Sequence, residues 1–320
     1  MLLFVQTGPG QTAHIGTAKA LEYGYGHTLD ISDRFNYQIN IVKYWSERLA
    51  SIDVLAQVTG LSTCAGECKP DGSTPIRPGG FRNQVLNIGE SYYRALYVGG
   101  IGHATPQWEW QVIYPFARPS KPVPSEGPAT RCDVVFDTDG NDLGDPEGGI
   151  RRQPIIPGCV YPAITPVIEY SKSDIRADVA RHIEAAQDSG LPGEPGGKPL
   201  TRLQDRAKKR QNGDTACPPR WARPTTPTVK SCDEYPFRSS HQGASTQQPQ
   251  GTGRTFAPPN TSWCEMDPAW GVPTGVTGPS GWSSCMLEAT QNTGAGRDLG
   301  SFYARNRVLD GDDFFVRIVP

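Results

Sequence analysis

Alternating apolar and polar positions dominate the first half of the chain. In residues 35–41 every second side chain from Phe35 onward is apolar or aromatic, and residues 108–114 repeat the pattern from Trp108. A period of two places successive side chains on opposite faces of a β-strand, so both segments are predicted strands with one buried face. Further short runs lie between turns rich in glycine and proline, as in an antiparallel sandwich.

We therefore expect an all-β, sandwich-like module of unknown role over residues 30–165, after a poorly defined segment at residues 1–29. Its tryptophans are expected in the core, with an aromatic ligand-binding platform as the alternative. Inside this module Asp137, Asp139 and Asn141 have the one-three-five spacing of a calcium loop. The glycine expected at position six and the acid expected at position twelve are missing. An acidic surface turn is therefore the first interpretation, and a Ca²⁺ site is the second.

The period changes at Ser173. Apolar residues then recur at helical spacing between a serine suited to an N-cap and Gly190, which predicts a helix over residues 173–190. His182 lies beside this apolar stripe, where we expect a hydrogen-bonded structural histidine. Residues 190–228 are rich in proline, glycine and basic side chains and are predicted to form a flexible basic connection. Its basic run at residues 208–210 is either solvated surface or a phosphate contact.

Near the end of the chain, Gly294 and Gly296 precede apolar positions at helical spacing, and a strand-like segment closes the sequence. A flexible approach to a helix N-terminus offers free N–H groups, which suit a phosphate. The fold class predicted for the whole chain is α+β, with the sandwich-like module followed by a small domain over residues 166–320.

Composition and charge limit the partners. The 320 residues carry a net charge of −2, so no global charge attracts nucleic acid, and phosphate binding would need a local patch or a metal ion. Glycine and proline are abundant, with 36 and 30 residues, which favours strands and loops over helices. No stretch is long enough for a membrane span.

The cysteines favour an oxidising compartment. Eight are spread through loop-like sequence, and four of them fall in the second half of the chain: Cys217, Cys232, Cys264 and Cys285. We expect disulfides within each half, with the connectivity left open. A zinc site is the alternative, but only Cys64 and Cys68 are closely spaced. The first ten residues lack the features of a signal peptide, so we expect a secreted protein whose true start lies upstream.

Two segments of the second half resemble a known family. They are CDEYPF at residues 232–237 and QNTGAGRDLGSFYARNRVLDGDDFFVRI at residues 291–318. Their order and content resemble the NucA/NucB family of secreted bacterial deoxyribonucleases, and the resemblance covers about half of the chain. It implies a small metal-dependent endonuclease similar in plan to the ββα-metal nucleases, with DNA as substrate and Mg²⁺ or Mn²⁺ as cofactor.

The resemblance also implies residue roles. Asp233 would be the general base that deprotonates water, Asn292 a metal ligand on or next to the helix, and Glu234 an anchor or a ligand through water. This suits phosphodiester hydrolysis, which needs an activated water and a hard cation held by oxygen ligands. Candidates for the scissile phosphate are Arg297, Arg305 and Arg307, with Gly294 and Gly296.

One position departs from the family. Members often carry an acidic residue where this chain has His241 or Gln242. Either the metal would be bound differently, or His241 would itself act as ligand or as acid toward the leaving oxygen.

Other functions are weighed against the nuclease. A glycosidase is disfavoured, because adjacent carboxylates on a strand point to opposite faces and cannot flank a sugar. The main alternative is a non-catalytic, disulfide-stabilised binding or adhesion protein with an inactive nuclease-like domain. The biological role is left open among scavenging, biofilm dispersal, competence and toxicity, and a toxin would require an immunity partner. The oligomeric state is left open as well.

Overall fold

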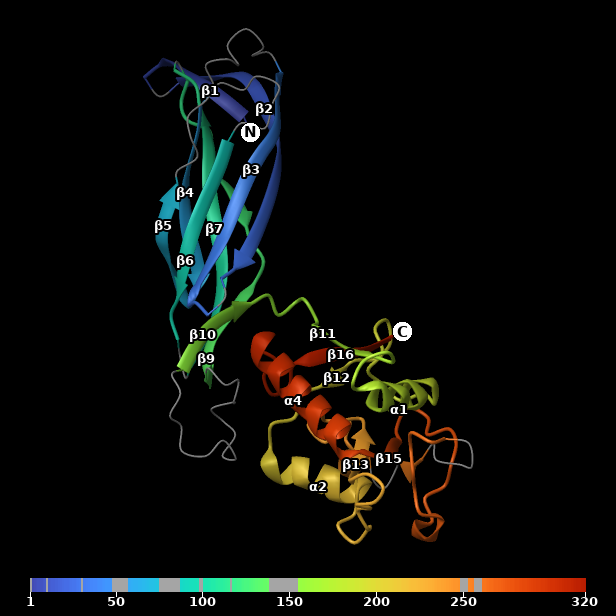
Figure 1. The fold of residues 1–320 in the computed structure, drawn as a ribbon. Coiled ribbons are helices and arrows are strands. Elements are labelled where there is room, and N and C mark those ends of the chain that lie inside the picture. The colour runs from blue at the N-terminus through green and yellow to red at the C-terminus, as the bar shows by residue number, and fades with distance from the viewer. Residues whose placement is uncertain are drawn as a thin grey trace. The chain divides into compact units, whose positions relative to one another are not determined.

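A computed structural model describes residues 2–9, 11–29, 31–47, 57–74, 87–97, 100–115, 117–137, 155–247, 253–255 and 261–320. The chain divides into two compact units (Figure 1). Unit 1 comprises Met1–Val135 and Ile155–Ala163, and unit 2 comprises Phe136–Pro154 and Ile164–Pro320. The fold is mixed and rich in strands, with several antiparallel sheets.

The described residues of unit 1 form two sheets. The first has the order β1-β2-β3-β6-β5, formed by β1 (Leu2–Gly8), β2 (Gln11–Thr28), β3 (Arg34–Glu47), β6 (Asn87–Ala95) and β5 (Cys68–Thr74). The second has the order β10-β9-β7-β4, formed by β10 (Ile155–Val160), β9 (Thr130–Asp137), β7 (Ile101–Ile113) and β4 (Gln57–Gly66), with β8 (Val123–Glu126) also paired to β7.

Buried side chains from both sheets form the core of unit 1. The predicted alternation is confirmed, since Phe35 and Ile39 of β3 and Trp108 of β7 are fully buried in one cluster. The segment expected to be poorly defined, residues 1–29, instead contributes β1 and β2 to the first sheet. Its alternation is weak because glycine, alanine and threonine fill many positions, and pairing with β3 supplies the order that the pattern does not predict.

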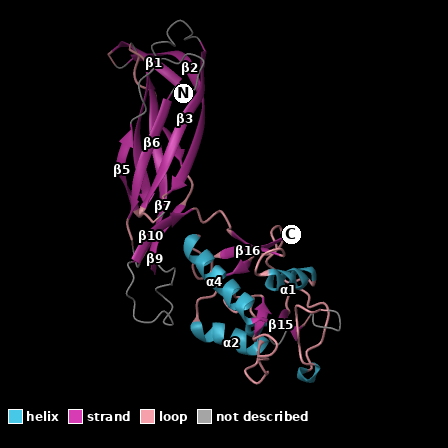
Figure 2. Ribbon diagram, in the orientation of Figure 1, coloured by secondary structure: helices cyan, strands magenta, loops and turns pink. Residues whose placement is uncertain are grey.

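The described residues of unit 2 form two small three-stranded sheets and four α-helices. Figure 2 shows its helices and strands by colour. One sheet has the order β11-β16-β12, formed by β11 (Val167–Ser171), β16 (Asp313–Val319) and β12 (Leu200–Thr201). The other has the order β13-β15-β14, formed by β13 (Lys230–Tyr235), β15 (Trp282–Glu288) and β14 (Gly253–Arg254). The helices are α1 (Ala177–Asp188), α2 (Arg206–Ala216), the short α3 (Ala244–Gln247) and α4 (Ala289–Arg305), and a 3-10 helix spans Pro268–Trp270.

Two expectations for unit 2 are corrected. The helix predicted from Ser173 begins at Ala177, and Ile175 is 73% exposed before it. The connection expected to be flexible between residues 190 and 228 contains β12 and α2, and the basic run lies on α2. The Asp205 side chain accepts a hydrogen bond from Lys208 N and caps this helix.

The disulfide prediction is confirmed. All eight cysteines pair, as Cys64–Cys68 and Cys132–Cys159 in unit 1 and as Cys217–Cys232 and Cys264–Cys285 in unit 2. Each half of the chain pairs internally, and the zinc alternative loses its thiolate ligands. In the described part of the chain, no helix combines the length and apolar character that a membrane span requires.

A candidate active site on strand β13

A strand pair followed by a helix carries the residues that the family resemblance singles out. Strand β13 pairs antiparallel with β15, with Asp233 opposite Cys285. Helix α4 begins directly after β15 and contacts both strands. Asp233 lies in the middle of β13, and Asn292 lies in the first turn of α4.

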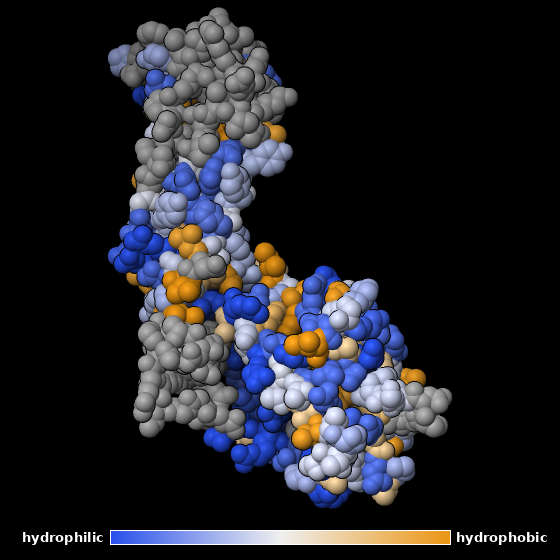
Figure 3. Space-filling view, in the orientation of Figure 1, coloured by the Kyte–Doolittle hydropathy of each residue, from blue (hydrophilic) through white to orange (hydrophobic). Residues whose placement is uncertain are grey.

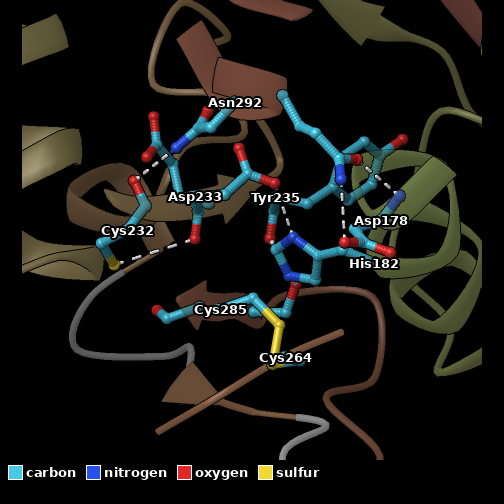
Figure 4. Close-up of polar contacts among 12 residues, drawn as sticks. Asp178, His182, Cys232, Asp233, Tyr235, Cys264, Cys285 and Asn292 are labelled. Atoms are coloured by element: carbon cyan, nitrogen blue, oxygen red, sulfur yellow. Dashed lines mark hydrogen bonds and ion pairs between the residues drawn. A yellow bond between two sulfur atoms is a disulfide. The ribbon is translucent and has the colours of Figure 1, made fainter. Parts of the chain in front are cut away.

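Asp233 is hydrogen-bonded to a buried histidine. His182 Nδ1 lies 2.7 Å from Asp233 Oδ2, and the His182 side chain is fully buried (Figure 4). A carboxylate can only accept hydrogen bonds, so Nδ1 carries the proton and donates it to Oδ2. Among the described residues Oδ1, the other carboxylate oxygen, has no hydrogen-bond partner, and the Asp233 side chain is 10% exposed. One oxygen of Asp233 is therefore fixed, and the other is available.

The second nitrogen of the histidine contacts a serine. His182 Nε2 lies 2.8 Å from Ser283 Oγ, which is also 3.4 Å from the main-chain oxygen of Tyr235. The order serine, histidine, aspartate resembles that of a hydrolytic triad. Ser283 is fully buried, however, and a nucleophile must reach its substrate. We therefore assign Ser283 to holding the imidazole and not to covalent catalysis.

Asn292 is anchored by its amide nitrogen. Asn292 Nδ2 donates to Cys232 O at 2.9 Å and to Ser231 Oγ at 3.0 Å. A carbonyl oxygen only accepts, so the atom facing Cys232 O must be the NH₂ group, and the orientation of the amide follows. The Asn292 Oδ1 atom therefore points away from these two partners, and it has no hydrogen-bond partner among the described residues.

Two hydrogen bonds join helices α1 and α4 next to Asn292. Gln291 Oε1 accepts a hydrogen bond from the main-chain N–H of Asp178, and Gln291 Nε2 donates to Asp178 Oδ2, both at 2.9 Å. Asp178 lies one turn before His182 on α1 (Figure 4), and Gln291 directly precedes Asn292 in the sequence. The paired contact therefore fixes the helix that carries His182 against the helix that carries Asn292.

Glu234 has different neighbours. Its Oε1 accepts from Arg238 N at 3.3 Å, and its Oε2 lies 3.8 Å from Cys217 Sγ. Desolvation by burial, together with the charge of Asp233, raises the pKa of Glu234 to about 7, and Arg238 opposes that rise. Adjacent strand residues face opposite ways, so Glu234 and Asp233 project from opposite faces of β13. Its role as a water-mediated metal ligand stays a prediction.

Among the described residues, His241 and Gln242 contact other residues of unit 2 and not Asp233 or Asn292. His241 is exposed, and its Nε2 lies 3.7 Å from Asp310 Oδ1. Gln242 accepts a hydrogen bond from Thr201 N and donates to Thr201 Oγ1. No recorded contact joins His241 to Asp233 or Asn292 in the described part of the chain. Its role as ligand or acid stays a prediction.

The glycine expectation is wrong in its geometry. Gly294 and Gly296 were expected to precede the helix, but α4 starts at Ala289, so both lie within it and their N–H groups fall in the helical ladder. Gly294 is buried, and a Cβ there would meet the guanidinium of Arg176, which explains the glycine. Arg297 and Arg305 are exposed on α4, as a phosphate contact requires. The third candidate, Arg307, is buried, so it does not offer an exposed phosphate contact.

No described group of three or more histidine, cysteine, aspartate or glutamate side chains is arranged to hold a metal ion. Asp139 and Asn141 of the calcium alternative lie outside the described residues, and Asp137 is the last residue of β9.

The contact between His182 and Asp233 is what sequence reasoning missed. The two residues are 51 positions apart, and no local pattern connects them. The available signal was a polar side chain on the buried face of α1, beside Val179, Ile183 and Ala186. A buried imidazole requires hydrogen-bond partners, and a carboxylate on a neighbouring strand is one that satisfies it.

No family model matches this chain, and no curated protein or solved structure matches it significantly.

Proposed function

We propose that unit 2 is a metal-dependent endonuclease that hydrolyses phosphodiester bonds of DNA without sequence specificity. One observation carries the proposal. The two residues that the family resemblance marks as base and metal ligand, Asp233 and Asn292, lie about sixty positions apart in sequence, yet Asn292 is hydrogen-bonded to the carbonyl group that directly precedes Asp233. The antiparallel pair β13–β15 followed by α4 also has the element order of a ββα-metal nuclease.

Asp233 is suited to the role of general base. His182 holds Oδ2 in a fixed direction, so the carboxylate presents Oδ1 without having to reorganise. A water hydrogen-bonded to Oδ1 would give up its proton to this atom as it attacks phosphorus. The bond from phosphorus to the leaving sugar oxygen would break, and that oxygen would take up a proton from solvent. The buried contacts of His182 with Asp233 and Ser283 limit rotation of the imidazole. In this scheme His182 is a positioning residue and does not touch the substrate.

Asn292 is suited to binding a divalent cation. Its amide nitrogen is engaged by the strand, which leaves a neutral oxygen of the type that Mg²⁺ and Mn²⁺ accept. Magnesium keeps several of its waters, so a site with few protein ligands fits the residues present. When bound, the cation would stabilise negative charge on the phosphate. Arg297 and Arg305 on the same helix are the candidate phosphate contacts.

We also propose that the protein is secreted. Four disulfides are the supporting feature, since disulfides persist in oxidising compartments. If the nuclease acts as a toxin, an immunity protein would be its partner.

A non-catalytic function is the second candidate. It is favoured by the burial of Asp233, whose side chain is 10% exposed. It is also favoured because the described residues contain no cluster of several carboxylates that could hold a metal ion. In that case unit 2 would be an inactive nuclease-like domain within a disulfide-stabilised binding or adhesion protein.

Plasmid nicking by the oxidised chain separates the two candidates. Wild type would be assayed with Mn²⁺ or Mg²⁺, with and without chelator, beside Asp233→Asn, Asn292→Ala and the control Asp188→Asn. Asp188 is an exposed carboxylate at the end of α1. We expect metal-dependent cleavage that falls by about a hundredfold or more in Asp233→Asn, the scale of a lost general base.

Asn292→Ala should raise the Mn²⁺ concentration needed for half-maximal cleavage by roughly tenfold or more. Asp188→Asn should cleave like wild type. Wild-type protein that leaves the plasmid intact with every metal, or Asp233→Asn that cleaves as fast as wild type, would sink the nuclease proposal.

A further inference from the structure

A short segment of unit 2 concentrates positive charge in a chain that carries a net charge of −2. Residues 205–223 contain six basic side chains against two carboxylates, Asp205 and Asp214. The basic residues are Arg206, Lys208, Lys209, Arg210, Arg220 and Arg223. One of the two carboxylates, Asp205, is already engaged in capping α2. The segment is therefore a local cationic surface, as phosphate binding requires in a chain without global positive charge.

Helix α2 exposes part of this cationic surface. Its inner face is held by buried Asn212, whose Nδ2 donates to the main-chain oxygens of Arg238 and Ser240, and whose Oδ1 accepts from Ser245. Lys208 and Arg210 lie on the exposed side of the helix. Among the described residues neither has a carboxylate within ion-pair distance. Their charges are not neutralised by this part of the protein.

The same helix is fastened to the strand that carries Asp233. Cys217 caps the C-terminus of α2 and forms a disulfide with Cys232, the residue before Asp233. Ser284 Oγ of β15 donates to Ala216 O in the last turn of the helix. Arg238, just beyond β13, lies along α2, since its Cδ is 3.5 Å from the position of a Cβ on Gly213. Basic side chains therefore extend from α2 to the end of β13.

We propose that α2 and the turn after it bind the phosphate backbone of duplex DNA. For the cleavage step this rests on the proposed nuclease function, whereas the binding itself is measured separately. Duplex DNA carries one negative charge per about 1.7 Å, and basic side chains bind it by releasing counterions. An 11-residue helix spans roughly 16 Å, enough to lie along several phosphates. Figure 3 shows strongly hydrophilic side chains along the α2 edge of unit 2.

Salt dependence of binding tests the proposal in chains that cannot cut. In an Asp233→Asn background, the affinity for a fluorescent duplex of about 20 base pairs would be measured from low to moderate salt. Lys208→Gln/Arg210→Gln would be compared with Lys172→Gln/Arg317→Gln. The control pair removes the same charge from unit 2, from cations already paired with Glu184 and Glu169. Circular dichroism would confirm that both variants fold.

We call the variant Lys208→Gln/Arg210→Gln the α2 pair. We expect it to lower the magnitude of the slope of log affinity against log salt by roughly 2 and to weaken binding about tenfold at low salt. The control pair should change the slope by much less. Equal losses in both pairs, or an unchanged slope in the α2 pair, would overturn the proposal. A chain that binds heparin through α2 but not duplex DNA would also overturn it.

The binding result is independent of the nuclease result. Cleavage is compared in chains that keep Asp233. If the parent cuts plasmid, and Lys208→Gln/Arg210→Gln binds DNA and cuts it as well as the parent does, the α2 proposal fails and the nuclease stands. If that parent chain does not cut but the α2 pair loses DNA binding, the nuclease fails and the α2 surface stands.

Discussion

His182 Nδ1 lies 2.7 Å from Asp233 Oδ2, a hydrogen bond that joins helix α1 to strand β13 inside unit 2. The contact fixes one oxygen of the carboxylate and leaves the other without a partner among the described residues. It also makes the aspartate depend on a residue 51 positions earlier in the chain.

Removing the imidazole should lower both stability and cleavage. His182→Leu leaves Asp233 and Ser283 buried without their partner, at a cost of about 1–3 kcal/mol for each group. His182→Asn keeps a donor close to the position of Nδ1. We expect cleavage to fall about a hundredfold in the leucine variant and by less than about tenfold in the asparagine variant, measured as kcat on protein shown to be folded. Equal kcat in the two variants would contradict a positioning role.

Glu234 should make the stability of unit 2 decrease as pH rises. Its folded-state pKa of about 7 lies above its value in an unfolded chain, so the folded state holds the proton more tightly. The resulting stabilisation is complete below about pH 4.5 and is lost as pH rises through 7. Each pKa unit corresponds to about 1.4 kcal/mol, which gives an upper bound of about 3 kcal/mol.

Because part of the Glu234 side chain reaches solvent, we expect a loss of about 1–2 kcal/mol between pH 5 and pH 8. Urea unfolding in chelator would measure it. The variant Glu234→Gln should lack this dependence, and an unchanged pH profile in that variant would count against the raised pKa.

The disulfide Cys217–Cys232 should stabilise unit 2 substantially. It closes a loop with a sequence separation of 15, for which the chain-entropy model gives about 3 kcal/mol. Replacing both cysteines by serine should lower the unfolding transition of unit 2 in calorimetry. The pair Cys64→Ser/Cys68→Ser in unit 1 is the control, because its loop has a separation of only 4. A unit 2 transition that does not move would show that other contacts hold α2 in place.

Two of the three glycines of α4, Gly294 and Gly296, should respond differently to alanine. A Cβ at Gly296 meets no atom within 4 Å, so Gly296→Ala should stabilise the helix by about 0.5–1 kcal/mol. Gly294→Ala should lose this gain, because its methyl group would displace the Arg176 guanidinium from its ion pair with Asp298. Adding Arg176→Ala to Gly294→Ala should restore the stabilisation of the helix by alanine. Thermal unfolding of the single and double variants would check this, and equal effects at both positions would refute it.

Local patterns predict the regular parts of this fold well. The buried alternation of β3 and β7 follows directly from residues 35–41 and 108–114, and most of α1 follows from its apolar spacing. Helix α2 was missed because its residues are nearly all polar. It is held by the Asp205 cap and by the buried amide of Asn212, and neither produces a periodic signal.

The candidate site was predictable only in part. The family resemblance singled out Asp233 and Asn292, but composition and periodicity could not show that they lie close together. The start of α4 was misplaced because glycine is a poor helix former, and the contact of Gly294 with Arg176 is tertiary. The histidine that holds Asp233 comes from a distant helix, and its role depends on packing that no short window of sequence contains.

Strand β16 lies between β11 and β12 in its sheet, and its Phe315 pairs with Val167 of β11, 148 residues earlier. A growing polypeptide therefore exposes the pairing edge of β11 until residues 313–319 have emerged. At about 5–20 residues per second, the ribosome would need roughly seven to thirty seconds to supply them. Unit 2 cannot complete this sheet before β16 has been synthesised, and until then β11 offers an open edge to other chains.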